Sequence, residues 1–218
     1  MRIIALADVH GSYGAMDVIL EAEEPYDAVV IAGDVTTKGT VQELESALHS
    51  LRSHGRPVVA VAGNMDPPPL EGALDDLGVG INGKGRVIGD VGFFGVSACP
   101  PTPFHSPNVV TEEEIARRAE AGWRDVVSAR WKLFVPHTPP VQTALDRTFL
   151  GRHAGSRSVR EFIERRCPHV VVCGHIHEAR GTEELGASRM VNCGSAARGY
   201  YAVLTFDAEP HIECRRRQ

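Results

Sequence analysis

The feature that most constrains the fold of this chain is the alternation of short apolar runs with amphipathic segments near its N-terminus. The runs at 2–8, 27–34 and 57–64 are rich in β-branched residues and predict strands, whereas 12–24 and 40–55 place apolar residues at helical spacing. This β-α-β-α-β rhythm favours parallel strands covered by helices. The sequence therefore predicts an α/β fold.

The later part of the chain departs from this rhythm. Residues 78–98 contain short β-prone pieces divided by glycine, which predicts hairpin-like strands. A helix is expected over 111–129, and a second helix over 159–167, with Ser158 as its N-terminal cap. Residues 188–207 are expected to form two closing strands around a glycine turn.

Composition limits the class of protein. The 218 residues, 43% of them hydrophobic, predict one domain covering 1–218, and no apolar run is long enough to span a bilayer. Five cysteines without a close pair, and no signal peptide, indicate a cytoplasmic protein. The net charge of −5 does not predict a broad nucleic-acid-binding face, and the basic run 215–217 is expected to be solvated.

Polar residues follow five of the predicted strands, and they are Asp8 and His10, Asp34, Asn64, His137, and His175 with His177. Ligands of open parallel sheets bind beyond the carboxyl ends of the strands, so these side chains are expected to meet in one cleft. Residues i and i+2 of an extended segment project to the same side, and glycines 33, 63 and 174 allow sharp turns or close approach of the backbone.

Imidazole, carboxylate and amide oxygen ligands suit divalent first-row metals such as Mn, Fe, Zn or Ni. Seven such groups exceed the needs of one ion, whereas two ions roughly 3.5–4 Å apart that share a carboxylate would use them all. A histidine at the end of a single strand is more often a structural residue. Because polar residues follow five predicted strands in this chain, a metal centre is favoured over that alternative.

The segments "DVHG", "GDV", "GNMD", "PHTPP" and "GHIHE" resemble the five motifs of the calcineurin-like metallophosphoesterases, in particular their compact bacterial and archaeal members. The resemblance implies a four-layer αββα sandwich of two mixed β-sheets flanked by helices. It also implies that Asp8, His10 and His177 hold one metal, that Asn64, His137 and His175 hold the other, and that Asp34 bridges both.

Such a centre would hydrolyse phosphate esters by means of a metal-bridging hydroxide, with Asp34 and Asn64 taking part in catalysis. Met65 departs from the family pattern, which commonly has a histidine there that acts on the leaving group. His153 is our candidate for a replacement acid, and Arg152 and His105 are candidates for substrate binding. Asp66 is expected to orient a ligand histidine from the second shell.

The predicted function is the hydrolysis of phosphodiesters with two divalent metal ions, of which Mn is favoured and Fe, Zn, Ni or Co are alternatives. The substrate is expected to be a small phosphate ester, with nucleic acid among the possible substrates and no membrane involved. Two other functions compete with it, a phosphomonoesterase of the same fold and a non-catalytic metal-binding scaffold for protein interactions.

Overall fold

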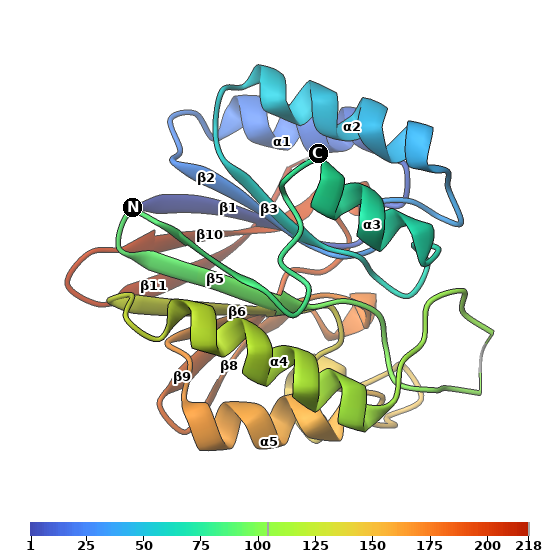
Figure 1. Ribbon diagram of the computed structural model, residues 1–218, viewed down its shortest axis with the longest axis vertical. Coiled ribbons are helices and arrows are strands. Elements are labelled where there is room, and N and C mark those ends of the chain that lie inside the picture. The colour runs from blue at the N-terminus through green and yellow to red at the C-terminus, as the bar shows by residue number, and fades with distance from the viewer. Residues whose placement is uncertain (104, 218) are drawn as a thin grey trace.

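The computed structural model describes residues 1–103 and 105–217 (Figure 1). Its α-helices are α1 (Tyr13–Ala22), α2 (Val41–Ser53), α3 (Pro69–Asp76), α4 (Glu112–Val126) and α5 (Arg157–Arg166). Three short 3-10 helices are η1 (Ala144–Asp146), η2 (His177–Ala179) and η3 (Ala196–Arg198). The strands are β1 (Arg2–Leu6), β2 (Ala28–Ala32), β3 (Val58–Val61), β4 (Gly85–Ile88), β5 (Val91–Val96), β6 (Trp131–Pro136), β7 (Val170–Cys173), β8 (Gly181–Leu185), β9 (Ser188–Asn192), β10 (Tyr200–Phe206) and β11 (Pro210–Arg216).

The strands form two mixed sheets. The first sheet has the order β11-β10-β1-β2-β3, in which β1, β2 and β3 are parallel and β10 runs antiparallel to β1. The second sheet has the order β4-β5-β6-β7-β9-β8, in which the four central strands are parallel and both edge strands are antiparallel to their neighbours. The predicted parallel start and the predicted hairpin within 78–98 are both confirmed.

The two sheets pack face to face, with α1, α2 and α3 outside the first and α4 and α5 outside the second (Figure 1). Strand β1 shows how the sequence produces this arrangement. Ile4 and Leu6 pack toward the helices of the first sheet, while Ile3 and Ala5 pack against the second sheet, because successive side chains of a strand point to opposite faces. The expected four-layer αββα sandwich is therefore confirmed.

The two strands expected over 188–207 are present as β9 and β10, with a glycine-containing turn between them, but they do not pair with each other. Strand β9 pairs with β7 and β8 in the second sheet, whereas β10 pairs with β1 and β11 in the first. Between them the chain crosses from one sheet to the other through η3, where the Ala196 amide donates to the Ala7 carbonyl at 2.8 Å. The turn thus joins the two sheets instead of closing a hairpin.

The N-terminal cap of α5 also differs from the prediction. Ser156, not Ser158, accepts a hydrogen bond from the Val159 amide, at 3.1 Å. The reason is a tertiary contact, because the Glu112 carboxylate accepts from the Ser156 hydroxyl at 2.6 Å and from the Ser158 amide at 3.0 Å. Glu112 therefore fixes an earlier start of the helix than the local pattern indicates.

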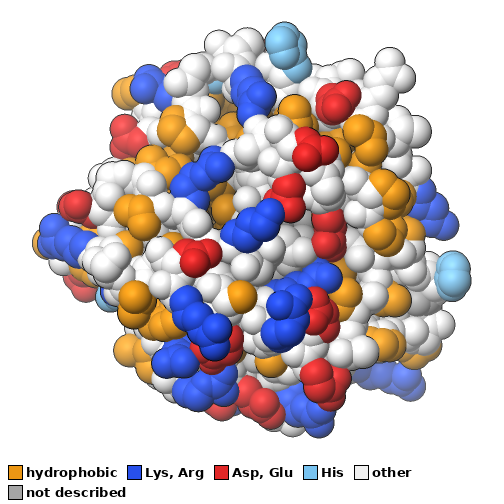
Figure 2. All heavy atoms as spheres, in the orientation of Figure 1, with side chains coloured by type: hydrophobic (Ala, Val, Ile, Leu, Met, Phe, Trp, Pro, Cys, Tyr) orange, Lys and Arg blue, Asp and Glu red, His pale blue; other side chains and the backbone are white. Residues whose placement is uncertain are grey.

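The surface over α4 and α5 carries paired charges. Arg165 and Arg166 both bind Glu120, at 2.5 Å and 2.8 Å. Figure 2 shows acidic and basic side chains interleaved over the lower part of this face, where Figure 1 places these helices. In the described part of the chain, every helix is too short or too polar to cross a membrane.

Candidate metal centre

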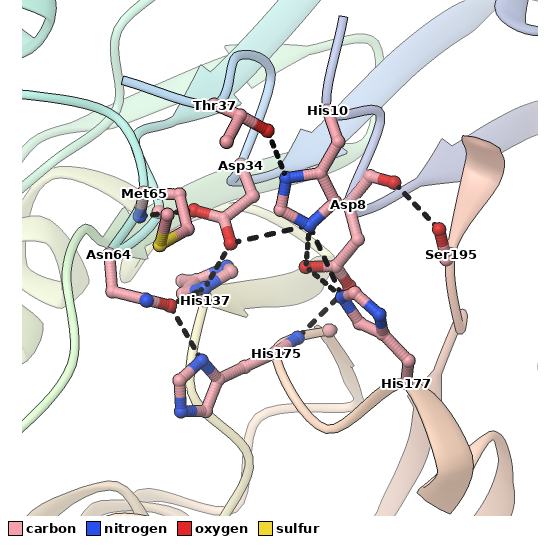
Figure 3. Close-up of polar contacts among 12 residues, drawn as sticks. Asp8, His10, Asp34, Thr37, Asn64, Met65, His137, His175, His177 and Ser195 are labelled. Atoms are coloured by element: carbon pink, nitrogen blue, oxygen red, sulfur yellow. Dashed lines mark hydrogen bonds and ion pairs between the residues drawn. The ribbon is translucent and has the colours of Figure 1, made fainter. Parts of the chain in front are cut away.

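Seven polar side chains meet at the ends of strands from both sheets (Figure 3). The first sheet contributes Asp8 and His10 after β1, Asp34 after β2, and Asn64 after β3. The second sheet contributes His137 after β6, and His175 and His177 after β7. The convergence expected from the sequence is therefore present in the structure, at the seam between the sheets.

Glycines allow the two sheets to approach at this seam. A Cβ atom on Gly33 would collide with the His137 ring, and one on Gly174 would collide with the Asp8 carboxylate. Gly33 also has a φ of +90°, a conformation that favours glycine. The close approach predicted for these glycines is confirmed, and it brings side chains of opposite sheets together.

Four of the seven residues have left-handed backbone conformations, with φ values of +55° for Asp8, +49° for His10, +50° for Asp34 and +69° for His175. Residues other than glycine rarely adopt this region, and it is costly to hold. The segments are therefore not extended, and the i, i+2 argument used for the sequence does not describe how the side chains meet. His175 and His177 in fact face different parts of the cluster.

Asp8, His10 and His177 form one half of the cluster. His177 Nε2 lies 3.3 Å from both His10 Nε2 and Asp8 Oδ1, and His10 Nε2 lies 3.9 Å from Asp8 Oδ1. Thr37 Oγ1 is 3.0 Å from His10 Nδ1 and so holds the ring with Nε2 toward its neighbours. One atom of each of the three residues could bind the same cation.

Asn64, His137 and His175 form the other half. Asn64 Oδ1 lies 2.9 Å from His137 Nε2 and 2.6 Å from His175 Nδ1. His137 Nδ1 donates to the Ala32 carbonyl at 2.8 Å. Because a carbonyl can only accept, a neutral His137 ring would present the lone pair of Nε2 to Asn64 Oδ1, and two electron-rich atoms would then face each other.

Asp34 lies between the two halves. Its Oδ2 is 3.6 Å from His137 Nε2 and 3.7 Å from His10 Nε2, and its Oδ1 accepts from the Met65 amide at 2.7 Å. Burial, together with the nearby carboxylates of Asp8 and Asp66, raises the pKa of Asp34 well above its usual value. A cation beside Asp34 would oppose both effects and keep the carboxylate ionised.

Three histidines of the cluster also have shifted pKa values. Burial and the charge of His137 lower the pKa of His175 to about 3, so its ring is neutral at pH 7 and has a lone pair to offer. Burial likewise lowers the pKa of His10. The adjacent Asp8 carboxylate raises the pKa of His177, and the positive charge of Arg198 opposes this rise.

The Asp8 carboxylate is the strongest single indication that this cluster binds a cation. The side chain is fully buried, and burial alone would raise its pKa, but the imidazoles of His177, His137 and His10 hold the pKa below its usual value. Among the described residues, Asp8 Oδ1 is a buried side-chain oxygen without a directed hydrogen bond. An orphaned carboxylate oxygen surrounded by imidazoles fits the donor set of a first-row divalent metal.

Asp66 has other partners than the histidine expected for it. Its carboxylate accepts from the Val35 amide at 3.1 Å, from both the amide and the hydroxyl of Thr36 at 2.8 Å, and from the Gly63 amide at 2.9 Å. Asp66 therefore ties the segment that follows β2 to the segment that follows β3. Its contribution to the cluster is to position the loops that carry Asp34 and Asn64.

The three candidates from the irregular loops lie apart from these contacts. His153 Nδ1 is 2.6 Å from the buried Asp146 carboxylate, and Arg152 is an exposed residue whose amide donates to the Thr148 hydroxyl at 3.2 Å. His105 is exposed. Within residues 1–103 and 105–217, none of the three makes a hydrogen bond or ion pair with the seven clustered residues.

Three contacts of the cluster carry no signal in the sequence. The Ser106 hydroxyl accepts from Asn64 Nδ2 at 3.0 Å, which turns Oδ1 toward the histidines, and the Ser195 hydroxyl donates to the Asp8 carbonyl at 3.0 Å. Thr37 supports His10, as described above. Serine and threonine in loops are too common for pattern or spacing to reveal these roles.

Comparison with known proteins agrees with this geometry. Residues 1–209 match the family model of the calcineurin-like phosphoesterase superfamily domain. An uncharacterised protein of Methanocaldococcus jannaschii, MJ1162, is 32% identical over 197 residues, which covers 88% of this chain and 87% of that protein.

Two solved structures share the fold. The protein TT1561 of Thermus thermophilus has a TM-score of 0.77 at 20% identity, and the match covers 99% of this chain and 98% of that one. A dimetal phosphatase of Danio rerio has a TM-score of 0.70 at 12% identity, and the match covers 99% of this chain and 96% of that one. Because the family model matches residues 1–209 of this chain, the chain belongs to the calcineurin-like phosphoesterase superfamily.

Proposed function

We propose that this protein hydrolyses phosphodiesters with the aid of two divalent metal ions held in the cleft between its sheets. Family membership supports a metal-dependent phosphoesterase. The observation that carries the proposal further is the pair of donor groups, one from Asp8, His10 and His177 and one from Asn64, His137 and His175, with Asp34 between them.

The donor atoms of the cluster fit such ions. Asp8 Oδ1 has no directed hydrogen bond, a neutral His137 ring would set the lone pair of Nε2 against Asn64 Oδ1, and burial beside other carboxylates disfavours an ionised Asp34. Each of these unfavourable features is relieved by positive charge. Bound there, two divalent ions would activate a water molecule and neutralise charge on the phosphoryl oxygens.

The protein's own residues would orient the site. Thr37 and the Ala32 carbonyl fix the rings of His10 and His137, and Ser106 fixes the amide of Asn64. Asp66 holds the loops that carry Asp34 and Asn64. We assign no proton-transfer role to Met65, because a thioether cannot donate a proton.

Two observations favour a diester over a monoester. A monoester carries an additional negative charge, and Arg152, the sequence candidate for neutralising it, makes no contact with the clustered residues in the described structure. Met65 replaces a leaving-group histidine, so esters whose leaving group needs no protonation are preferred. His153, held by Asp146, remains the candidate acid for other esters.

The test compares bis-p-nitrophenyl phosphate with p-nitrophenyl phosphate in the presence of Mn²⁺, with chelator-treated protein as the metal-free reference. We expect metal-dependent release of nitrophenol and a higher kcat/KM for the diester. No turnover with any of Mn, Fe, Zn, Ni or Co would contradict the proposed activity. A higher kcat/KM for the monoester would identify a phosphomonoesterase instead.

Three further expectations stay predictions within this proposal, namely that residues 1–218 act as one domain, that Mn is the native metal and that the protein works in the cytoplasm. All five cysteines are free, which is consistent with a reducing compartment. Metal analysis of protein purified without added metal tests whether Mn is the native metal. A single cooperative unfolding transition would support the prediction that residues 1–218 act as one domain.

A further inference from the structure

Two arginines stack on Tyr200 near the proposed metal centre, and a third precedes Tyr200 by two residues. The Arg180 guanidinium carbon lies 4.4 Å from the centre of the Tyr200 ring, and that of Arg216 lies 4.8 Å from it. Arg198 belongs to η3, two residues before Tyr200. We call Arg180, Arg198 and Arg216 the arginine cluster.

Backbone contacts place the arginine cluster next to Asp8. Strand β10 begins at Tyr200 and pairs with β1, whose chain continues to Asp8, and Tyr200 lies directly opposite Arg216 on β11. Neighbouring strands are about 4.8 Å apart, so the Arg216 backbone lies on the order of 10 Å from the end of β1. The Ser195 hydroxyl, bonded to the Asp8 carbonyl at 3.0 Å, holds the start of η3 against the cleft (Figure 3).

The guanidinium groups of the arginine cluster have no carboxylate partner among residues 1–103 and 105–217. Some other arginines of this protein are paired, as Arg165 and Arg166 are with Glu120, whereas the exposed Arg152 also has no carboxylate partner among the described residues. The expectation that the basic run 215–217 is simply solvated is also wrong, because Arg215 binds the buried Glu23 at 2.7 Å and Arg216 stacks on Tyr200.

The arginine cluster is held in place although its charges are unpaired. The stem of Arg180 packs over Gly194, where an added Cβ would lie 2.9 Å from Arg180 Cδ. Stacking of a guanidinium on an aromatic ring is a stabilising cation–π contact, and it applies here to Arg180 and Arg216. Side chains ordered in this way lose less entropy when they bind an anion.

The three arginines are exposed, and a planar guanidinium is the group that proteins use to bind phosphate through two parallel hydrogen bonds. Arg198 ends η3, which begins directly after Ser195 at the Asp8 carbonyl, and Arg180 directly follows η2, which begins at His177. An anion bound at the arginine cluster would therefore lie beside, and not within, the group of metal ligands.

We propose that the arginine cluster binds a second phosphate group of the substrate, so that the preferred substrate is a phosphodiester that carries a further phosphate. This inference rests on the proposed phosphodiesterase activity and specifies its substrate class. The second phosphate can be the terminal group of a nucleotide chain or of a nucleotide phosphoanhydride, and both present the same charged oxygen triad to the arginines.

The test uses two esters that differ only in the second phosphate, thymidine 5′-(p-nitrophenyl phosphate) with and without a 3′-phosphate. The measured quantity is the ratio of their kcat/KM values in Mn²⁺, for the wild-type protein and for Arg198→Ala and Arg180→Ala. Arg130→Ala is the matched control, because Arg130 also stacks on an aromatic ring, that of Trp131 at 4.9 Å, but lies at the start of β6.

We expect the wild type to favour the 3′-phosphorylated ester by about tenfold, the size of one charge-assisted hydrogen bond. Arg198→Ala and Arg180→Ala should bring the ratio close to one, and Arg130→Ala should leave it at the wild-type value. A wild-type ratio near one, or a ratio that survives both cluster variants, would overturn the inference. Failure to hydrolyse either ester would instead refute the proposed activity itself.

A competition experiment separates the two sources of the second phosphate. The dinucleotide pTpT and ADP are compared as inhibitors of bis-p-nitrophenyl phosphate hydrolysis at constant free Mn²⁺. Stronger inhibition by pTpT assigns the arginine cluster to a nucleotide chain, and stronger inhibition by ADP assigns it to a phosphoanhydride. Inhibition constants that are the same for wild type and Arg198→Ala with both compounds would overturn the inference.

Discussion

Replacement of Asp66 by asparagine tests how the cleft is supported. Asp66 is 1% exposed, and its two carboxylate oxygens accept four hydrogen bonds from two loops. One oxygen accepts from the Val35 and Gly63 amides, and the other accepts from the amide and hydroxyl of Thr36. Asparagine keeps the shape but turns one of these oxygens into a donor.

The size of the effect follows from this geometry. An NH₂ group cannot accept. Turned toward Val35 and Gly63 it would leave both amides without an acceptor, whereas turned toward Thr36 it would leave only the Thr36 amide without one, because the Thr36 hydroxyl can accept from the NH₂ group. A buried donor left unsatisfied costs about 1–3 kcal/mol, and the amide should take the orientation that leaves one backbone amide without an acceptor, so we expect a loss of about 2 kcal/mol in the free energy of unfolding. The loops that carry Asp34 and Asn64 would loosen together.

The assay is urea unfolding of metal-free protein, followed by titration of the folded variant with Mn²⁺. Asp76→Asn is the control, because Asp76 is an exposed carboxylate on α3 without a hydrogen bond or ion pair in the described structure. Asp66→Asn should lose stability and bind Mn²⁺ more weakly, whereas Asp76→Asn should do neither.

A loss below about 1 kcal/mol for Asp66→Asn would refute the reasoning, since surface substitutions already reach half that size. If the variant shows the predicted loss of stability but binds Mn²⁺ with unchanged affinity, the loops keep the ligands in place without Asp66.

Three other predictions concern the cluster. Asp34→Asn should abolish Mn²⁺-dependent turnover yet raise the unfolding temperature of metal-free protein, and unchanged turnover would exclude the bridging role. Because the folded pKa of Asp34 is raised, its ionisation removes stability as pH rises through that pKa. The variant should therefore lose less stability with rising pH in thermal unfolding scans. Met65→His should increase turnover of esters with poor leaving groups by up to about 10²-fold in steady-state kinetics, and an unchanged rate would show that another acid already serves. Ser106→Ala should weaken Mn²⁺ binding about tenfold in calorimetric titrations, with activity recovered at saturating metal; an unchanged affinity would mean that Asn64 is oriented without the hydroxyl.

Much of the first sheet could be predicted because each of its parallel strands is buried on both faces. The run 27–34 contains β2, and every residue of that strand is buried. Such strands appear in a sequence as uninterrupted β-branched runs, and their polar ends mark the exit to the cleft. The position of Asp34 followed from this pattern alone, before any side-chain geometry was known.

Elements that depend on partners far along the chain could not be predicted. Strand β8 alternates between partly buried and exposed residues at the edge of its sheet and has little apolar signal of its own. The start of α5 is decided by Glu112, which lies 44 residues before Ser156. Local patterning cannot reveal a cap that is selected by a carboxylate from another helix.

The same reason explains which site residues could be predicted. His137 and His177 stand at strand exits, so their positions follow from the sheet, but the left-handed backbone at Asp8 does not follow from any pattern. The sequence did not predict a role for Arg180 and Arg198, because arginines that do not directly follow a predicted strand resemble solvated surface residues. Arg180 became apparent through its stacking on Tyr200, and Arg198 through its place at the end of η3, which follows Ser195 at the Asp8 carbonyl.

The seam between the sheets also has a mechanical consequence. The nitrogens of His10 and His177 are 3.3 Å apart although 167 residues separate them, and Asn64 meets His137 across 73 residues. Ions held by both sheets would act as removable crosslinks between the two halves of the polypeptide. Amide hydrogens along β1 and β7, and not only those of the ligand residues, should then exchange with solvent more slowly when the metals are bound. The rate at which the two sheets separate would become a measure of metal occupancy.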